Sequence, residues 1–181
     1  MCHLTAERER RIMTTASQTF EESAFTQNPL DTLEEIIGAN DWSFERASNE
    51  EMLAEVAGRW CSYRLFFFWQ EEISAMQFSC QFDLKVPEKK RRDVAELLGI
   101  INERMWLGHF DVDSEELTPM FRHTTLLRGA QAASQEQLED LVDIALTECE
   151  RFYPAFQFIL WGGKSASEAV SAAILDTVGE A

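Results

Sequence analysis

The segment from Trp60 to Leu84 constrains the fold more than any other part of the chain. It reads WCSYRLFFFWQ, then a polar break around Glu71, then AMQFSCQFDL, and this pattern predicts two strands joined by a turn. In the second strand apolar residues alternate with polar ones, as in an antiparallel sheet with one buried face. In the first strand the alternation fails at Phe66 and Phe68, where the second face also becomes apolar. The sheet should therefore have two apolar faces, each covered by a helix or by another molecule.

Short alternating segments and helical spacing predict the other elements. Asn28 caps a first helix and Pro29 fits its first turn, where the N–H that proline lacks has no partner anyway. We predict helices at 29–38, 87–106, 134–161 and 165–178, and strands at 42–47, 52–57, 60–70, 76–84, 109–113 and 117–127. Neighbouring strands this close in sequence pair antiparallel, because a parallel return needs a crossover. The predicted order, α-β-β-β-β-α-β-β-α-α, indicates an α+β fold with helices packed on an antiparallel β-sheet.

The third predicted helix is the longest. Ser134 and Gln137 form a capping box at its start, and Gly162 stands at its end. Pro154 lies inside it and predicts a kink or a split, because proline removes a helical hydrogen bond.

The composition predicts one domain. A chain of 181 residues that is 45% hydrophobic can bury a substantial core. We assign residues 28–181 to a single α+β domain and residues 1–27 to a flexible N-terminal extension. Within that extension, residues 1–12 are expected to be dispensable, as if they came from an upstream start codon.

The net charge restricts the partners and the compartment. A formal charge of −16 and a pI of about 4.5 repel phosphate backbones, so we expect no nucleic-acid partner. The N-terminus lacks the apolar core of a signal peptide, and the apolar run 158–161 is too short to span a bilayer. We therefore expect a cytoplasmic protein without membrane contact.

The four cysteines, at positions 2, 61, 80 and 149, do not predict a metal site. They lack the short paired spacings of zinc ligands. We interpret Cys61 and Cys80 as small buried hydrophobic residues on strand faces in a reducing compartment. No metal or cofactor is predicted.

Two loops carry partial ligand-binding motifs. The sequence GGKS at 162–165 ends like a phosphate-binding loop, but Phe158 occupies the position of the required first glycine. The acidic stretch 111–115 has the first three spacings of a calcium loop, but Glu116 replaces its essential glycine. We interpret the first loop as a helix cap and the second as a solvated acidic turn.

His109 and His123 are candidate general bases, because histidine titrates near neutral pH. Neither has a neighbouring nucleophile, and the chain has no GxSxG motif. We therefore predict no catalytic residues and no enzymatic activity. The alternative is a small-ligand-binding protein or weak hydrolase, with a pocket between sheet and helices that uses one of these histidines.

The first group of candidate protein-interaction residues is aromatic and comprises Trp60, Phe66 and Phe68. The simplest cover for these rings is the chain's own third helix. The alternative is a second copy of the chain or a client protein. We expect the intramolecular cover.

The second group is the basic run Lys89, Lys90, Arg91 and Arg92. It crowds the first turn of the second predicted helix, where the helix dipole disfavours positive charge. We interpret it as a solvated polar face or, alternatively, as a site that docks on the acidic surface of a partner or of a second copy.

Three segments carry a resemblance to a known family: NPLDTLEEIIGANDWSFERASNEEM, YRLFFFWQEEISAMQFSCQFDLKVPEKKRRDVAELLGIINERMWLGHF and YPAFQFILWGGKS. They are similar to the YbjN family of bacterial proteins, over about residues 28–178. The element order resembles the fold of type III secretion chaperones. The resemblance implies a regulator of sensory transduction or stress response, with no established reaction and no catalytic residues to transfer.

Secretion chaperones of this fold are small acidic homodimers that hold extended protein segments. Our leading hypothesis is a non-enzymatic protein-interaction module, chaperone-like or regulatory, that binds other proteins. It is motivated by the doubly apolar third strand, the acidic surface and the absence of a predicted active site. Homodimerisation is a further possibility that the hypothesis leaves open.

Overall fold

The computed structural model describes residues 26–178, so most of the predicted extension 1–27 lies outside the described residues. Thr26 and Gln27 already belong to the packed chain. The Thr26 hydroxyl is buried and lies 3.1 Å from the Ala130 carbonyl oxygen, and the Gln27 N–H donates to the Gln131 carbonyl. The packed chain therefore begins before the predicted boundary at residue 28.

The observed order of helices and strands is the predicted one. The elements are α2 (Pro29–Ala39), β1 (Ser43–Arg46), β2 (Glu51–Ala57), β3 (Ser62–Gln70), β4 (Ala75–Gln81), α3 (Arg91–Asn102), β5 (His109–Val112), β6 (Pro119–Leu126), α4 (Gln135–Leu160) and α5 (Ala166–Val178), with short 3-10 turns η1 (Glu71–Ile73) and η2 (Glu88–Lys90). The prediction of an α+β fold is confirmed.

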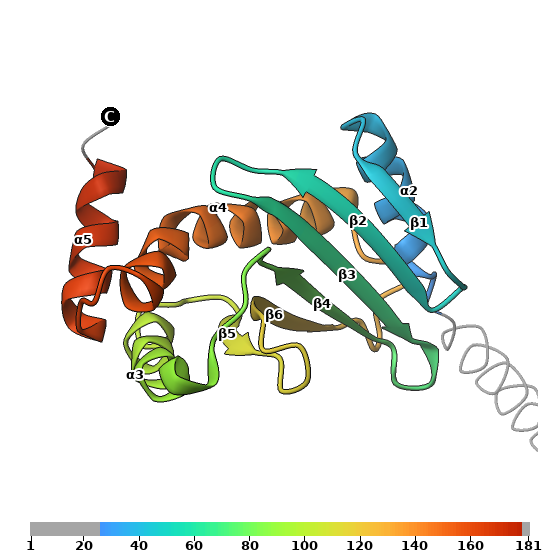
Figure 1. Cartoon of the computed structure of the whole chain (residues 1–181). Helices are drawn as coiled ribbons and strands as arrows, with labels where there is room; N and C mark the ends of the chain where they lie inside the picture. Colours follow the sequence, from blue (N-terminus) through green and yellow to red (C-terminus); the bar gives the residue numbers. More distant parts are fainter. Residues whose placement is uncertain (1–25, 179–181) are drawn as a thin grey trace, which may run out of the picture.

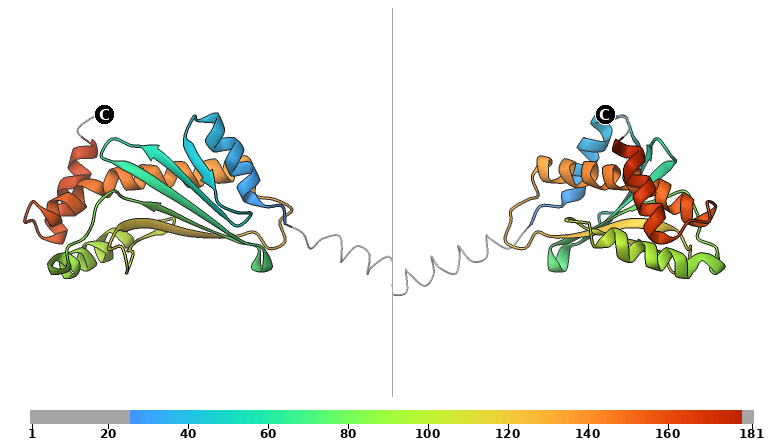
Figure 2. Two further views of the ribbon diagram at one scale, coloured as in Figure 1. Left: turned by 45° about the vertical axis from the view of Figure 1, so that its right-hand side comes forward. Right: turned by 90° about the vertical axis from the view of Figure 1, so that its left-hand side faces the viewer.

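All six strands form one antiparallel sheet in the order β1-β2-β3-β4-β6-β5. Helix α4 crosses behind this sheet in Figure 1, with α2 beside β1 and with α3 and α5 at the opposite end. The sheet face toward the viewer carries no helix of the described residues, and the turned views of Figure 2 agree. We call these two sides the covered face and the outer face.

The core lies between the covered face and α4. Alternate residues of β3, from Tyr63 to Trp69, are at most 2% exposed. The long apolar stripe of α4 supplies the other side of this core, including Cys149, Phe152 and Phe156. Burial of each large apolar side chain contributes about 1.5–3 kcal/mol to the free energy of unfolding. The helix therefore stays on this face.

Two predicted boundaries were wrong for local reasons. The predicted helix 87–106 ends at Asn102, whose side chain bonds both the N–H and the C=O of Phe110 and so ties the helix end to β5. The predicted strand 76–84 ends at Gln81, because its partner strand β6 begins at Pro119.

Helix α4 runs unbroken through Pro154, although a kink or a split was predicted there. Proline has no N–H, so the Glu150 carbonyl four residues earlier loses its helical donor. The Trp60 indole Nε1–H donates to that carbonyl oxygen at 3.1 Å. The Trp60 ring also stacks on Tyr153, with ring centroids 6.3 Å apart. A side chain from the sheet therefore replaces the bond that proline removes from the helix.

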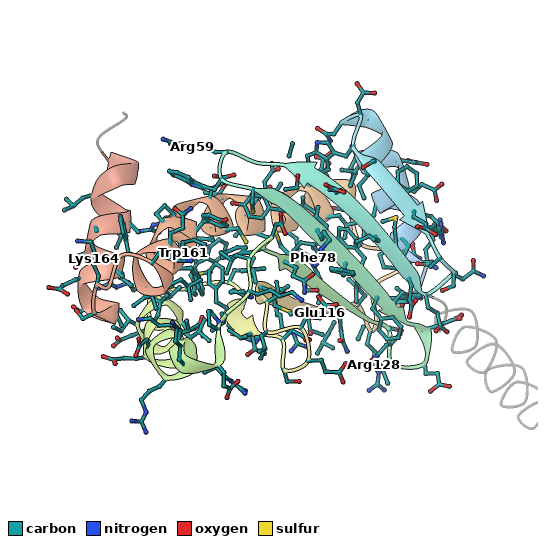
Figure 3. All side chains as sticks on the ribbon, viewed as in Figure 1. Arg59, Phe78, Glu116, Arg128, Trp161 and Lys164 are labelled. Carbon is teal, nitrogen blue, oxygen red and sulfur yellow. The ribbon has the colours of Figure 1, made fainter. Side chains whose placement is uncertain are left out.

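The turn between β2 and β3 is built to reach α4. The Arg59 N–H donates to the Glu150 carboxylate at 2.7 Å, from the hairpin tip labelled in Figure 3. Gly58 leaves room for this approach, because a Cβ there would collide with the Tyr63 ring and with the Glu150 carboxylate. Trp60 thus belongs to this turn rather than to the strand, which begins at Ser62 and not at residue 60.

The Trp60 bond predicts an energetic coupling with Pro154. Trp60→Phe keeps an aromatic ring but leaves the Glu150 carbonyl without a donor, and should lower the free energy of unfolding by about 1–2 kcal/mol. In a Pro154→Ala background the helix regains its own N–H donor, so the same Trp60→Phe change should cost less than half as much. Urea unfolding of the four proteins measures both costs, and equal costs in the two backgrounds would contradict the coupling.

Candidate protein-interaction surface

Phe66 and Phe68 lie on the outer face of the sheet. Strand pairing places Phe66 between Leu53 of β2 and Ser79 of β4, and Phe68 beside Glu51. Phe66 is 37% exposed and Phe68 is partly buried by its strand neighbours. Within the described residues, no helix lies over this face of the sheet (Figure 1).

The expectation that the third predicted helix covers these two rings is therefore wrong. That helix, α4, packs on the opposite face, against the four alternate β3 residues Tyr63, Leu65, Phe67 and Trp69. Successive strand residues point to opposite faces, so a helix that buries this set cannot touch Phe66 or Phe68. Whether another molecule covers the outer face stays a prediction.

Trp60 is separated from the other two candidates. Its ring packs on α4 and is further covered by the Arg59 guanidinium, 4.7 Å from the ring centroid. Trp60 is thus the one candidate ring that its own third helix covers, and its contacts serve the fold.

The basic run lies in a third place, at η2 and the start of α3. Two of its side chains are paired locally: Lys90 with Asp93 at 2.8 Å and Arg91 with Glu88 at 3.3 Å. The carboxylates of Asp93 and Glu88 offset the unfavourable interaction of these two cations with the helix dipole. Lys89 and Arg92 are exposed. The predicted role of this run in partner binding stays a prediction.

The cations of the outer face are already paired with carboxylates. Arg122 of β6 lies 3.2 Å from Asp111 of β5, and Arg64 of β3 lies 3.6 Å from Glu116. Glu116 belongs to the loop between β5 and β6 (Figure 3). The Arg64 guanidinium also lies 5.9 Å from the centroid of the Phe66 ring. The positive charges near the aromatic rings are thus largely neutralised.

The acids of the neighbouring strands are not paired in this way. Glu45 of β1 and Glu51 and Glu55 of β2 lie on the outer face, by their register with Leu53 and its neighbours. All three are exposed, and no ion pair among the described residues involves them. The β1–β2 side of the outer face is therefore negatively charged.

A hollow of about 590 Å³ adjoins Phe68 at the β3–β4 turn. Ile73, in the 3-10 turn η1, is 57% exposed at its edge. The hollow is lined by Glu50, Phe68, Trp69, Gln70, Glu71, Glu72 and Ile73. Sequence reasoning treated this stretch only as a polar break, although an isoleucine directly after two glutamates in a turn was a signal for an exposed apolar site.

The two partial ligand motifs form ordinary caps and turns. Glu168 and Ser165 cap the start of α5 reciprocally, so the GGKS segment links two helices as interpreted. The Asp113 carboxylate accepts from the N–H groups of Glu115 and Glu116, which occupies it within the acidic turn. Over residues 26–178, no group of three or more His, Cys, Asp or Glu side chains could hold a metal ion.

The two histidines do not converge. His109 pairs with Arg122 on the outer face, whereas His123 follows Arg122 in β6 and points to the covered face beside Phe78. Burial lowers the pKa of His123, and the positive charge of His109 lowers it further. The arrangement does not assemble a shared acid–base pair.

The described thiols lie between β3, β4 and α4. The Sγ atoms of Cys80 and Cys149 are 3.5 Å apart and both residues are fully buried, as expected for Cys80. Burial raises the pKa of the Cys149 thiol. Cys61 is only partly buried, because it sits in the turn before β3.

Comparison with known proteins gives a family. Residues 29–158 match the model of the YbjN family, described as "Putative bacterial sensory transduction regulator", which confirms the resemblance seen in the sequence. No curated protein matches the chain. One similar solved structure is described as "YbjN, a putative transcription regulator from E. coli", with 16% identity and a TM-score of 0.47, over 66% of this chain and 84% of that chain. A likeness of this size carries no conclusion about function.

The helices of residues 26–178 include none with the length and apolar character needed to cross a bilayer. The predicted cytoplasmic location stays a prediction.

The position of His123 predicts a pH dependence of stability. Because the folded chain holds its pKa below 6.5, the unfolded chain takes up this proton first as the pH falls. The free energy of unfolding should therefore decrease between about pH 7 and about pH 5. His123→Gln should abolish the contribution of His123 to that decrease, whereas His109→Gln should reduce it only in part, because it removes the electrostatic cause of the lowered pKa and leaves the burial of His123 unchanged. Urea unfolding at both pH values measures it, and an unchanged decrease in His123→Gln would contradict the assignment.

Proposed function

Because the chain belongs to the YbjN family, we propose that it is a non-enzymatic protein-interaction module, a chaperone-like or regulatory factor of bacterial signalling or stress response. The observation that carries the proposal is the outer face of the sheet, which carries Phe66 and Phe68 and over which no helix of residues 26–178 lies (Figure 1). Its partners are other proteins, among them a possible second copy of the chain.

The dimensions of the outer face support this function. The six strands are four to nine residues long and lie about 4.8 Å apart, and with a rise of about 3.3 Å per residue they present roughly 600 Å². That area lies near the lower limit for specific interfaces, which bury roughly 600 Å² or more per partner. Phe66 and Phe68 stand near its centre among polar and charged neighbours, which is the usual arrangement of an interface.

We do not extend the proposal to the alternative of a small-ligand-binding protein or weak hydrolase. That alternative requires His109 or His123 in a pocket between sheet and helices, and His109 lies on the outer face. His123 lies on the covered face beside Phe78, and the structure does not bring the two histidines to one site.

The proposal predicts a loss of binding without a loss of fold. Phe66→Ser with Phe68→Ser should reduce partner capture at least about tenfold, because two aromatic anchors of an interface are removed. The circular dichroism spectrum should stay that of the native protein. Affinity capture from the native organism, quantified by mass spectrometry, measures the loss, and sedimentation reports any self-association.

The control removes two apolar side chains elsewhere that are more exposed than Phe66 and Phe68. Trp106 is 75% exposed and Leu175 is 71% exposed, on other elements of the chain. Trp106→Ser with Leu175→Ser should leave capture unchanged. Unfolding of the Phe66 and Phe68 double variant would show that the rings are structural, and unchanged capture would refute their role in binding.

A further inference from the structure

We propose that the hollow at the β3–β4 turn and the adjoining outer face bind an extended peptide segment, apolar at one end and basic at the other. This inference rests on the proposed function, and it adds the chemistry of the partner. The apolar part would lie on Phe66 and Phe68, and the basic part would reach the glutamates of the hollow.

The apolar part of the site follows the direction of β3. Phe66 and Phe68 are two residues apart on one strand face, which separates them by about 7 Å. Side chains at alternate positions of an extended peptide have the same spacing. Ile73 continues the apolar surface past the end of β3 into the hollow. An extended segment with apolar residues two positions apart therefore matches this row.

The charged part of the site lies at the end of the same row. Glu50, Glu71 and Glu72 line the hollow and are exposed. No ion pair among the described residues involves their carboxylates. A basic side chain that follows the apolar part would meet three carboxylates that have no cation of their own.

The surrounding charges favour a basic partner over an acidic one. Arg64 of β3 and Arg122 of β6 are engaged with Glu116 and Asp111, so among the described residues an acidic segment would find chiefly Arg128, which follows β6 beside the β3–β4 turn (Figure 3). A second copy of the chain carries the same net charge of −16 and would be repelled. A basic-apolar peptide is therefore the occupant that the face fits.

The test uses the full chain and a fluorescein-labelled peptide with two phenylalanines at alternate positions, followed by three arginines. Its fluorescence anisotropy should report saturable binding. The same peptide with glutamates in place of the arginines should bind at least about tenfold more weakly. Added salt should lower the affinity of the basic peptide, because it screens the attraction between opposite charges.

Two triple variants separate the site from general charge attraction. Glu50→Gln, Glu71→Gln and Glu72→Gln together should lower the affinity about tenfold, since three exposed ion pairs are lost. The matched control removes three exposed carboxylates on α2 and near α3, with Glu35→Gln, Glu96→Gln and Glu103→Gln. It should leave the affinity within about twofold.

Three results would overturn the inference: an equal loss in both triple variants, equal binding of the acidic peptide, or self-association through Phe66 and Phe68 that excludes the peptide. Failure of the inference is distinguishable from failure of the proposed function. If Phe66→Ser with Phe68→Ser abolishes partner capture while the basic peptide does not bind, the outer face still binds proteins and only the assigned chemistry is wrong.

Discussion

The hydrogen bond from the Trp60 indole to the Glu150 carbonyl joins the sheet to the helix that covers it. Pro154 has no N–H to donate to the Glu150 carbonyl, and the Trp60 indole N–H takes the place of that missing donor. The Arg59 N–H and the side-chain-free Gly58 complete the contact. This attachment holds α4 over one face, and the availability of the opposite face follows from it.

In residues 26–178 the sheet has two apolar faces and one layer of helices, so these residues cover only one of the two faces. Four large β3 side chains on the covered face outweigh Phe66 and Phe68 in buried area, so α4 packs on the larger set. Phe66 on the outer face is 37% exposed, so part of its apolar ring stays in contact with water, which is unfavourable. Exposed aromatic surface of this kind is typical of a binding site.

Positive and negative side chains on the outer face differ in whether they form ion pairs. Arginines on β3 and β6 are paired within the face, whereas the glutamates of β2 and of the β3–β4 turn are not. Exposed glutamates that make no ion pair among the described residues therefore lie beside Phe66 and Phe68. The basic run from Lys89 to Arg92 lies on other elements and is partly neutralised by its neighbours.

The sequence by itself determined the element order, the helix caps at Asn28, Ser134 and Ser165, and the two apolar faces of β3, because these depend on local periodicity and capping chemistry. It identified Phe66 and Phe68 as unusual, but not which face a helix would cover. Only the tertiary structure decided that, because the choice depends on how α4 packs from over sixty residues away. The bond from Trp60 to the Glu150 carbonyl likewise joins segments distant in sequence, which no local pattern encodes.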